Sequence, residues 1–295
     1  MNSDESDIQR GRMRDVNAPA WVVRCSNLAV DYKLALAQYS ATHLIKGGTV
    51  VQMASGTTLN CLMDEIIRVQ NTTGPLDLLI LTNNLQVLAK GRDAYNSMPG
   101  TFGTMQIVLT GGTLHPSLDS LTGSYAAKGV DTEMIVPDIV FFGAAGISFS
   151  GGLTIAYHFQ DEISTQVAYA TRKTHDRVLL CDHSKVGLQV AGFRSDIDLQ
   201  AMLRDAQAVT VLLTVPLVDS KLPGQEGKVD DKRIEAETAA FRVLLQPLSD
   251  DLRFMGKECT LRYINRNGSV HSELCLTQVR DGDPSSNDSV RPIRL

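Results

Sequence analysis

The sequence lacks any apolar run of about 18 residues, the length that a membrane-spanning helix needs. Its first residues, MNSDESDIQRGRMRDVN, are polar and contain no apolar core of a signal peptide. Neither membrane insertion nor secretion is therefore expected, and we predict a cytoplasmic protein. The 6 histidines show no metal-ligand spacing, so neither a metal nor another cofactor is predicted.

Cysteine is also scarce. The 5 cysteines are an odd number and form no C-x-x-C pair, and three of them lie in or beside apolar runs. These features disfavour a disulfide framework and indicate reduced, buried thiols. The cysteines are Cys25, Cys61, Cys181, Cys259 and Cys275.

Clustered positive charge is missing as well. The chain carries 28 lysines and arginines against 33 acidic residues, a net charge of -5, and its basic residues are scattered. A nucleic-acid surface needs a basic patch or stripe, so direct DNA binding is not expected.

The length and apolar content of the chain favour a globular protein. With 295 residues, 43% of them hydrophobic, it can bury a core in one large domain or two small ones.

Six short apolar runs recur along the chain. They do not alternate apolar with polar residues, which indicates strands covered on both faces, and the spacers are long enough for crossover helices. We therefore predict an α/β fold with a doubly wound, mostly parallel sheet. The runs are 49–55, 76–84, 105–112, 138–146, 177–184 and 208–214.

Two helices are predicted around the first of these runs. Apolar residues recur at helical spacing between Leu28 and Ile45, and two glycines directly afterwards end that helix. Apolar residues at i, i+3, i+4, i+7 and i+8 from Leu59 predict an amphipathic helix over 58–70.

The turn SGTT at 55–58 lies between the first run and the second helix. In open α/β sheets, ligands bind where strand ends lead into helix N-termini. A helix that begins at Thr57 or Thr58 directs unpaired amides and a partial positive charge at this turn. We predict that the turn holds an anion, most simply a phosphate, with help from the hydroxyls of Ser55, Thr57 and Thr58. In the structural alternative, Ser55 or Thr57 caps the helix and Gly56 permits the turn.

The other predicted strand ends are small, hydroxyl-bearing or glycine-rich. Lys185 either supplies a point charge to a phosphate or hydroxyl, or is a solvated surface lysine. Asp182 orients a sugar hydroxyl, pairs with Lys185 or forms an Asx turn, and His183 fits a packed or hydrogen-bonded loop histidine better than a catalyst. These strand ends are TNN at 82–84, TGG at 110–112, GAAG at 143–146 and DHSK at 182–185.

In this order, the pieces resemble a known family. The series IKGGTVVQMASGTT, LILTNN, VLTGGTLHPSLDSLTG, DIVFFGAAGISFSGGLT and RVLLCDHSKVG, continuing into FRSDIDL, is similar to the C-terminal sensor domain of the DeoR family of bacterial sugar-metabolism repressors. The likeness covers about residues 28–215. It implies a Rossmann-like fold similar to ribose-5-phosphate isomerase and the CoA transferases.

The resemblance also implies a ligand, a phosphorylated sugar or a related small metabolite, and a homo-oligomer. The phosphate is expected against the turn at 55–58, and other strand ends are expected to line the rest of the pocket. Glu162 is included because family members carry an acid early in the corresponding helix. The expected ligand-binding residues are Ser55, Gly56, Thr57, Thr58, Thr82, Asn83, Gly111, Gly112, Glu162, Asp182 and Lys185.

Two departures from the family pattern limit the analogy. Family repressors carry a winged helix-turn-helix ahead of the sensor, and here residues 1–27, which read as a flexible tail, are too few for one. Many sensor domains and the related isomerases place acids in a GADGID-like turn, where this chain has Ala145 and Ser148. Proton transfer between sugar carbons requires a positioned base, so no catalytic residue is predicted.

Residues 216–280 are expected to form an extension to the sensor domain at 28–215, followed by a disordered tail at 281–295. An apolar stripe predicts a helix over 231–256, and Asn-Gly at 267 and 268 predicts a β-hairpin. Residues 216–295 together hold 12 basic and 13 acidic residues, which again disfavours DNA binding. The extension is a small subdomain, an oligomer contact, a partner-binding surface or a cover for the sheet edge.

Three hypotheses for function follow. The first is a stand-alone sensor that binds a phosphorylated sugar and regulates transcription or sugar metabolism through a protein partner. The second is an isomerase-like enzyme acting on a sugar phosphate. The third is an interaction or scaffold protein that binds no ligand.

Overall fold

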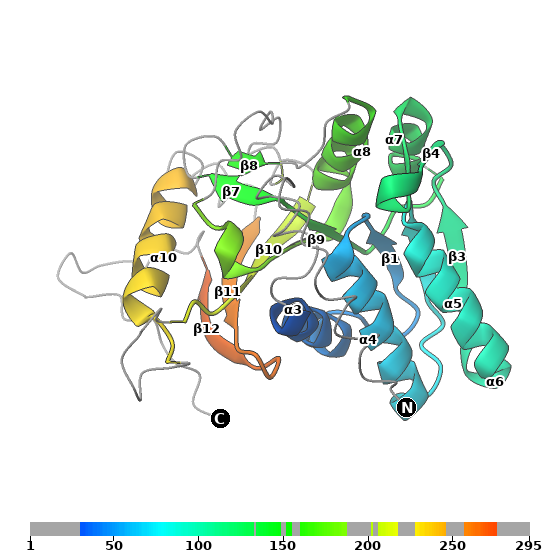
Figure 1. The fold of residues 1–295 in the computed structure, drawn as a ribbon, viewed down its shortest axis with the longest axis horizontal. Coiled ribbons are helices and arrows are strands. Elements are labelled where there is room, and N and C mark those ends of the chain that lie inside the picture. Colours follow the sequence, from blue (N-terminus) through cyan, green and yellow to red (C-terminus); the bar gives the residue numbers. More distant parts are fainter. Residues whose placement is uncertain are drawn as a thin grey trace, which may run out of the picture.

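The central sheet has eight strands in the order β12-β11-β10-β9-β6-β1-β2-β3 (Figure 1). Neighbouring strands are parallel throughout, except that β12 is antiparallel to β11. The structure is a computed structural model that describes residues 30–132, 134–148, 152–154, 160–187, 202, 206–217, 228–245 and 257–275. The predicted doubly wound, mostly parallel α/β fold is confirmed.

The predicted apolar runs each contain a strand of this sheet. The sheet strands are β1 (Val50–Met53), β2 (Leu79–Thr82), β3 (Gln106–Leu109), β6 (Ile139–Gly143), β9 (Thr174–Cys181), β10 (Ala206–Thr214), β11 (Glu258–Ile264) and β12 (Val270–Cys275). Two small antiparallel hairpins pair β4 (Thr113–His115) with β5 (Ser120–Thr122) and β7 (Gly146–Ser148) with β8 (Gly152–Thr154).

Helices cover both faces of the sheet. The α-helices are α3 (Val30–His43), α4 (Thr57–Thr73), α5 (Leu85–Ser97), α6 (Pro99–Phe102), α7 (Ser124–Val130), α8 (Gln160–Thr171) and α10 (Asp231–Leu245), and the 3-10 turns are η1 (Pro116–Leu118) and η2 (His183–Lys185). The expected helices over 28–45 and 58–70 correspond to α3 and α4. Residues 246–256 of the expected C-terminal helix lie outside the described residues.

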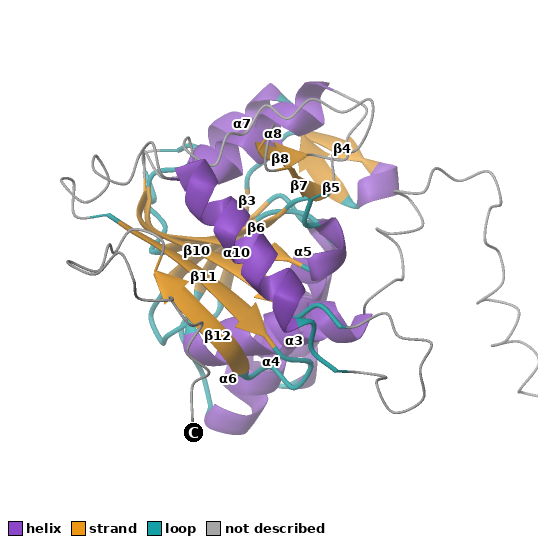
Figure 2. Ribbon diagram, turned by 90° about the vertical axis from the view of Figure 1, so that its left-hand side faces the viewer, coloured by secondary structure: helices purple, strands orange, loops and turns teal. Residues whose placement is uncertain are grey.

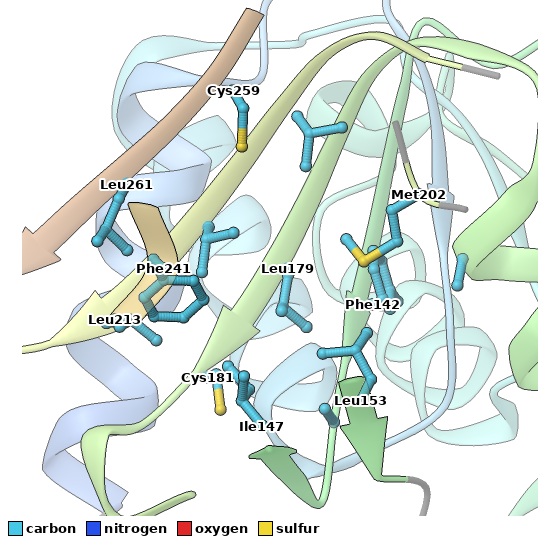
Figure 3. Packing of buried hydrophobic residues seen from close by; sticks show 14 of the residues in the cluster. Phe142, Ile147, Leu153, Leu179, Cys181, Met202, Leu213, Phe241, Cys259 and Leu261 are labelled. Atoms are coloured by element: carbon cyan, nitrogen blue, oxygen red, sulfur yellow. The ribbon is translucent and has the colours of Figure 1, made fainter. Parts of the chain in front are cut away.

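Successive residues of one strand point to different cores, as a sheet covered on both faces requires. Val211 and Leu213 of β10 belong to a core with α8 and α10, whereas Leu212 between them belongs to a core with α3 and α4. Figure 3 shows the first core, in which Phe241 of α10 packs beside Leu213 and Leu261. This double burial explains why the strands are apolar runs without alternation.

The strand order places a topological switch beside β1. The chain runs from β1 through β2 to the edge strand β3, and then returns to β6, which pairs with β1 on its other side. The loops that leave β1 and β6 therefore lead away in opposite directions, and in open α/β sheets ligands bind at the carboxyl ends of strands at such a switch.

The C-terminal helix and hairpin are present, and the hairpin joins the central sheet. β11 pairs with β10 in parallel from Ala208 to Thr214, and β12 forms the antiparallel edge (Figure 2). Gly268 in the turn has φ +78°, a conformation that suits glycine. The described part of the extension therefore continues the sheet, while the domain limits at 27/28, 215/216 and 280/281 stay predictions.

The cysteines that the structure describes form no disulfide with one another. Cys181 and Cys259 are buried, and Cys61 and Cys275 are half-buried. Burial raises the pKa of both Cys181 and Cys259 to about 12, so these thiols stay protonated and packed. Cys25 lies outside the described residues.

An arginine within β9 generates a prediction about stability. Arg177 is fully buried, and its guanidinium donates to the carbonyl oxygens of Met202 and Arg172, the latter directly after α8. Arg177→Met should leave these buried carbonyls without their donor and lower the free energy of unfolding by about 3 kcal/mol. Urea unfolding followed by circular dichroism measures the change.

A matched control is Arg92→Met, because the Arg92 side chain is 68% exposed. That variant should change the free energy of unfolding by less than about 0.5 kcal/mol. Equal unfolding midpoints for Arg177→Met and the unmodified protein would contradict the structural role of Arg177.

Candidate functional site

The polar loops gather at one edge of the sheet, because the strands they follow are parallel. The loops after β1, β2, β3, β6 and β9 all leave from carboxyl ends. Direct bonds tie three of them together. The Thr82 hydroxyl donates to the Met53 carbonyl oxygen at 2.7 Å, and the Thr110 amide donates to the Thr82 carbonyl oxygen at 3.0 Å.

The turn at 55–58 has the geometry of an anion cradle. Helix α4 begins at Thr57, within the predicted range, and Gly56 is its N-cap with φ +132°. Gly56 and Thr57 are exposed, whereas Ser55 and Thr58 are buried. Gly56 has no side chain to cap the helix, so the capping alternative for Ser55 or Thr57 does not describe the N-cap.

Three backbone amides at the start of α4 are available as hydrogen-bond donors. The amides of Thr57, Thr58 and Leu59 have no hydrogen-bond acceptor among the residues that the structure describes, and the first bond of this turn runs from the Asn60 amide to the Gly56 carbonyl oxygen at 3.0 Å. The 17 residues of α4 add a partial positive charge at the same end. Donors and charge together favour an anion here.

The TNN segment after β2 is buried and extensively hydrogen-bonded. Thr82 also accepts a bond from the Asn84 amide at 3.0 Å, and Asn84 caps α5 by accepting from the Gln86 amide. The Asn83 amide donates to the Tyr169 hydroxyl at 2.9 Å, and its side-chain Nδ2 donates to the Leu121 carbonyl oxygen within β5 at 2.9 Å. Because the Thr82 hydroxyl both donates and accepts a hydrogen bond within the protein, Thr82 is mainly a structural residue.

One acceptor in this segment stays open. Asn83 Oδ1 is buried and has no hydrogen-bond donor among the described residues. Burial raises the pKa of Tyr169, so the phenol beside Asn83 stays neutral. Asn83 Oδ1 is thus a neutral acceptor, of the kind that binds a hydroxyl donor.

The two glycines after β3 serve different structural needs. Both have positive φ, +76° at Gly111 and +114° at Gly112. A Cβ on Gly112 would lie 2.7 Å from the Thr122 carbonyl oxygen and 2.8 Å from Ala126 Cβ, whereas open space surrounds Gly111. Packing of β5 and α7 against the loop therefore accounts for Gly112 without a ligand.

The DHSK segment after β9 forms η2. Asp182 is buried, and its Oδ1 accepts bonds from the Ser184 amide at 3.2 Å and from the Ser184 hydroxyl. Its Oδ2 lies 3.5 Å from Lys185 Nζ, and the Lys185 side chain is only 12% exposed. Of the alternatives for Asp182, the Asx turn and the pairing with Lys185 are both present, and Lys185 is not a solvated surface residue.

His183, between these two residues, is hydrogen-bonded and packed as predicted. Its amide donates to the Thr214 hydroxyl at 3.0 Å, and its Nδ1 lies 3.0 Å from the same oxygen. The ring meets Tyr32 edge-on, with 4.8 Å between ring centroids. Burial, followed by the charge of Arg233, lowers the pKa of His183 and favours the neutral ring.

The remaining predicted site residue, Glu162, lies in the first turn of α8. The turn after β6 places Ala144 and Ala145 at the switch point, and Ser148 lies in β7. Within the described ranges, no cluster of three His, Cys, Asp or Glu side chains is placed to hold a metal ion. Among the described helices, none has the length and apolarity needed to cross a bilayer.

Sequence reasoning missed two residues near this edge. Lys33 is only 3% exposed. Burial raises the pKa of Cys61 on the neighbouring α4, and the positive charge of Lys33 works against that shift. A lysine within the apolar stripe of the first predicted helix was the available signal. Tyr169, the partner of Asn83, gave no such signal because 86 residues separate the two.

Comparison with known proteins places this geometry in a family. The family described as DeoR C terminal sensor domain matches residues 29–194, more than half of the chain. No curated protein matches the chain.

Solved structures with similar folds have low sequence identity. Ribose 5-phosphate isomerase A from Methanocaldococcus jannaschii has 16% identity and a TM-score of 0.35, over 53% of this chain and 54% of that one. The ribose 5-phosphate isomerase from Plasmodium falciparum has 12% identity and a TM-score of 0.35, over 53% of each chain.

Translation initiation factor eIF-2B from Pyrococcus horikoshii OT3 has 12% identity and a TM-score of 0.35, over 55% of this chain and 50% of that one. The chain thus spans about half the length of these solved structures. On the strength of the family match, the chain belongs to the DeoR C-terminal sensor domain family.

Proposed function

We propose that this protein is a sensor that binds a phosphorylated sugar or a related metabolite at the carboxyl edge of the sheet. The observation that carries the proposal is the set of amides of Thr57, Thr58 and Leu59 at the start of α4, beside the switch point between β1 and β6. A phosphate fits such donors because it accepts several hydrogen bonds and carries charge complementary to the helix dipole.

The other proposed contacts suit the sugar rather than the phosphate. Asp182 and Lys185 already pair with each other, so together they offer an acceptor and a donor with little net charge. Asn83 Oδ1 offers another neutral acceptor. In this proposal Thr82, Gly111, Gly112 and Glu162 complete the pocket wall.

The spacing of the strands supports a ligand of this size. β6 separates β1 from β9, so the phosphate turn and the DHSK segment are two strand spacings apart, about 10 Å. A phosphorylated sugar can bridge this distance with its phosphate at one end and its hydroxyls at the other.

For the output of the sensor, we propose a protein partner that controls transcription or sugar metabolism, and self-association of the chain. The family is one of sensor domains, and the basic residues of this chain are scattered among a larger number of acids, which disfavours direct contact with DNA. We place this activity in the cytoplasm.

The proposal predicts stabilisation by ligand. A panel of phosphorylated sugars and polyol phosphates should contain at least one compound that raises the melting temperature. A ligand at 100 times its dissociation constant stabilises the folded state by about 2.7 kcal/mol, which shifts the midpoint by several degrees. Scanning calorimetry with unphosphorylated sugars as the control provides the measurement, and a flat response to the whole panel would sink the proposal.

A substitution tests the phosphate turn itself. Thr57→Asp should place a carboxylate where the phosphate is proposed to lie, and like-charge repulsion should weaken binding by about tenfold to a hundredfold. Folding should survive, because an acidic residue suits the first turn of a helix. Isothermal titration calorimetry with the ligand found in the panel gives the affinity.

Thr104→Asp is the matched control for this test. Thr104 is exposed and lies before β3, at the opposite edge of the sheet, so the same change in charge should leave the affinity as it was. If Thr57→Asp binds as tightly as Thr104→Asp, the phosphate lies elsewhere.

A further inference from the structure

The carbonyl of His183, at the centre of the DHSK segment, is held by an arginine from the C-terminal extension. Arg233 on α10 donates from Nη2 to the His183 carbonyl oxygen at 2.9 Å, across 50 residues of sequence. A guanidinium that donates to a carbonyl forms a charge-assisted hydrogen bond, which is stronger than one between neutral groups. This bond fixes the backbone between Asp182 and Lys185.

Arg233 is itself fixed in place by buried partners. Its Nε donates to Glu237 Oε1 at 2.8 Å, and Glu237 Oε2 accepts from the Tyr263 hydroxyl at 3.1 Å. Glu237 is 6% exposed and Tyr263 is 1% exposed. Burial raises the pKa of Glu237, and the bond from Arg233 works against that shift. The arginine is therefore directed at His183 by Glu237 on its own helix, which Tyr263 of β11 holds in turn.

The hairpin turn supports the same histidine from the other face of the sheet. Arg266 donates to the Tyr32 hydroxyl at 3.0 Å, and its guanidinium lies 4.9 Å from the centroid of that ring. Tyr32 in turn packs edge-on against His183. α10 belongs to one core and α3, which carries Tyr32, to the other. Residues 228–245 and 257–275 therefore hold η2 from both faces of the sheet, directly through Arg233 and indirectly through Arg266 and Tyr32.

We propose that Arg233 is a positioning residue for the ligand pocket, and that residues 228–245 and 257–275 set ligand affinity by holding η2. This inference rests on the proposed function, because it takes Asp182 and Lys185 as ligand contacts. It assigns a role to a part of the chain that lies beyond the family match at 29–194. The sensor domain and the extension then act as one binding unit.

The test uses Arg233→Met in the full chain, with Lys232→Met as the matched control. Lys232 is exposed on the same helix, so the control makes the same change in charge without touching η2. Hydrogen exchange at the amides of His183 and Lys185 should be about tenfold faster or more in Arg233→Met only. Affinity for any phosphorylated sugar or polyol phosphate that stabilises the protein in the panel should fall by about tenfold in the same variant, whereas affinity for inorganic phosphate, which the α4 amides are proposed to bind, should stay unchanged.

Titration of the His183 ring by NMR adds a readout that general loss of stability would not move. The charge of Arg233 lowers the pKa of His183, while Asp182 raises it and Arg266 lowers it. Arg233→Met should therefore raise the pKa of His183, and Lys232→Met should leave it unchanged. Arg233→Lys, which keeps the charge and one donor, should recover part of the exchange protection.

The outcomes separate this inference from the proposed function. If the unmodified protein binds no compound while Arg233→Met still speeds hydrogen exchange in η2, the proposed function is wrong, but the conclusion that Arg233 holds η2 in place is supported. If ligand binds and Arg233→Met matches Lys232→Met in both exchange and affinity, the positioning role is overturned. Equal weakening in both variants would point to net charge and would overturn it as well.

Discussion

Parallel hydrogen bonding of β1 to both β2 and β6 is the constraint on which the rest of the structure depends. It directs all the neighbouring strand ends toward one edge, so that loops far apart in sequence become neighbours. It also sets the switch beside β1, where α4 starts with open amides. A sheet with one of these strands reversed would carry that loop to the opposite edge.

At this edge, backbone amides offer donors for an anion, whereas most of the polar side chains hold the loops in place. The α4 amides can meet an anion without reorganisation, because the helix already holds them in place. The side chains of Thr82 and Asp182 mostly bond to the protein and keep the loops rigid, whereas Asn83 Oδ1 keeps an open acceptor among the described residues. The described turn after β6 carries Ala144 and Ala145, whose side chains cannot transfer a proton.

The C-terminal extension is part of the same structural unit. β11 lengthens the sheet beyond β10, and α10 contributes Ile234 and Phe241 to the core that Leu179 and Leu213 share. The same helix also bonds to η2, because Arg233 donates to the His183 carbonyl oxygen. Packing of α10 and the position of η2 therefore depend on one helix.

Local patterns in the sequence predicted most strands of the central sheet, three of the helices and the strand-end motifs, because apolar runs, helical spacing and glycine turns are properties that a single segment displays. From these the sheet class, the start of α4 and one possible pairing, Asp182 with Lys185, could be predicted. Only the tertiary structure decided that the hairpin joins the sheet, that Arg177 is buried, and that Arg233 reaches His183. These features depend on contacts between distant segments, and a polar residue's sequence neighbours do not reveal which carbonyl it will face after folding.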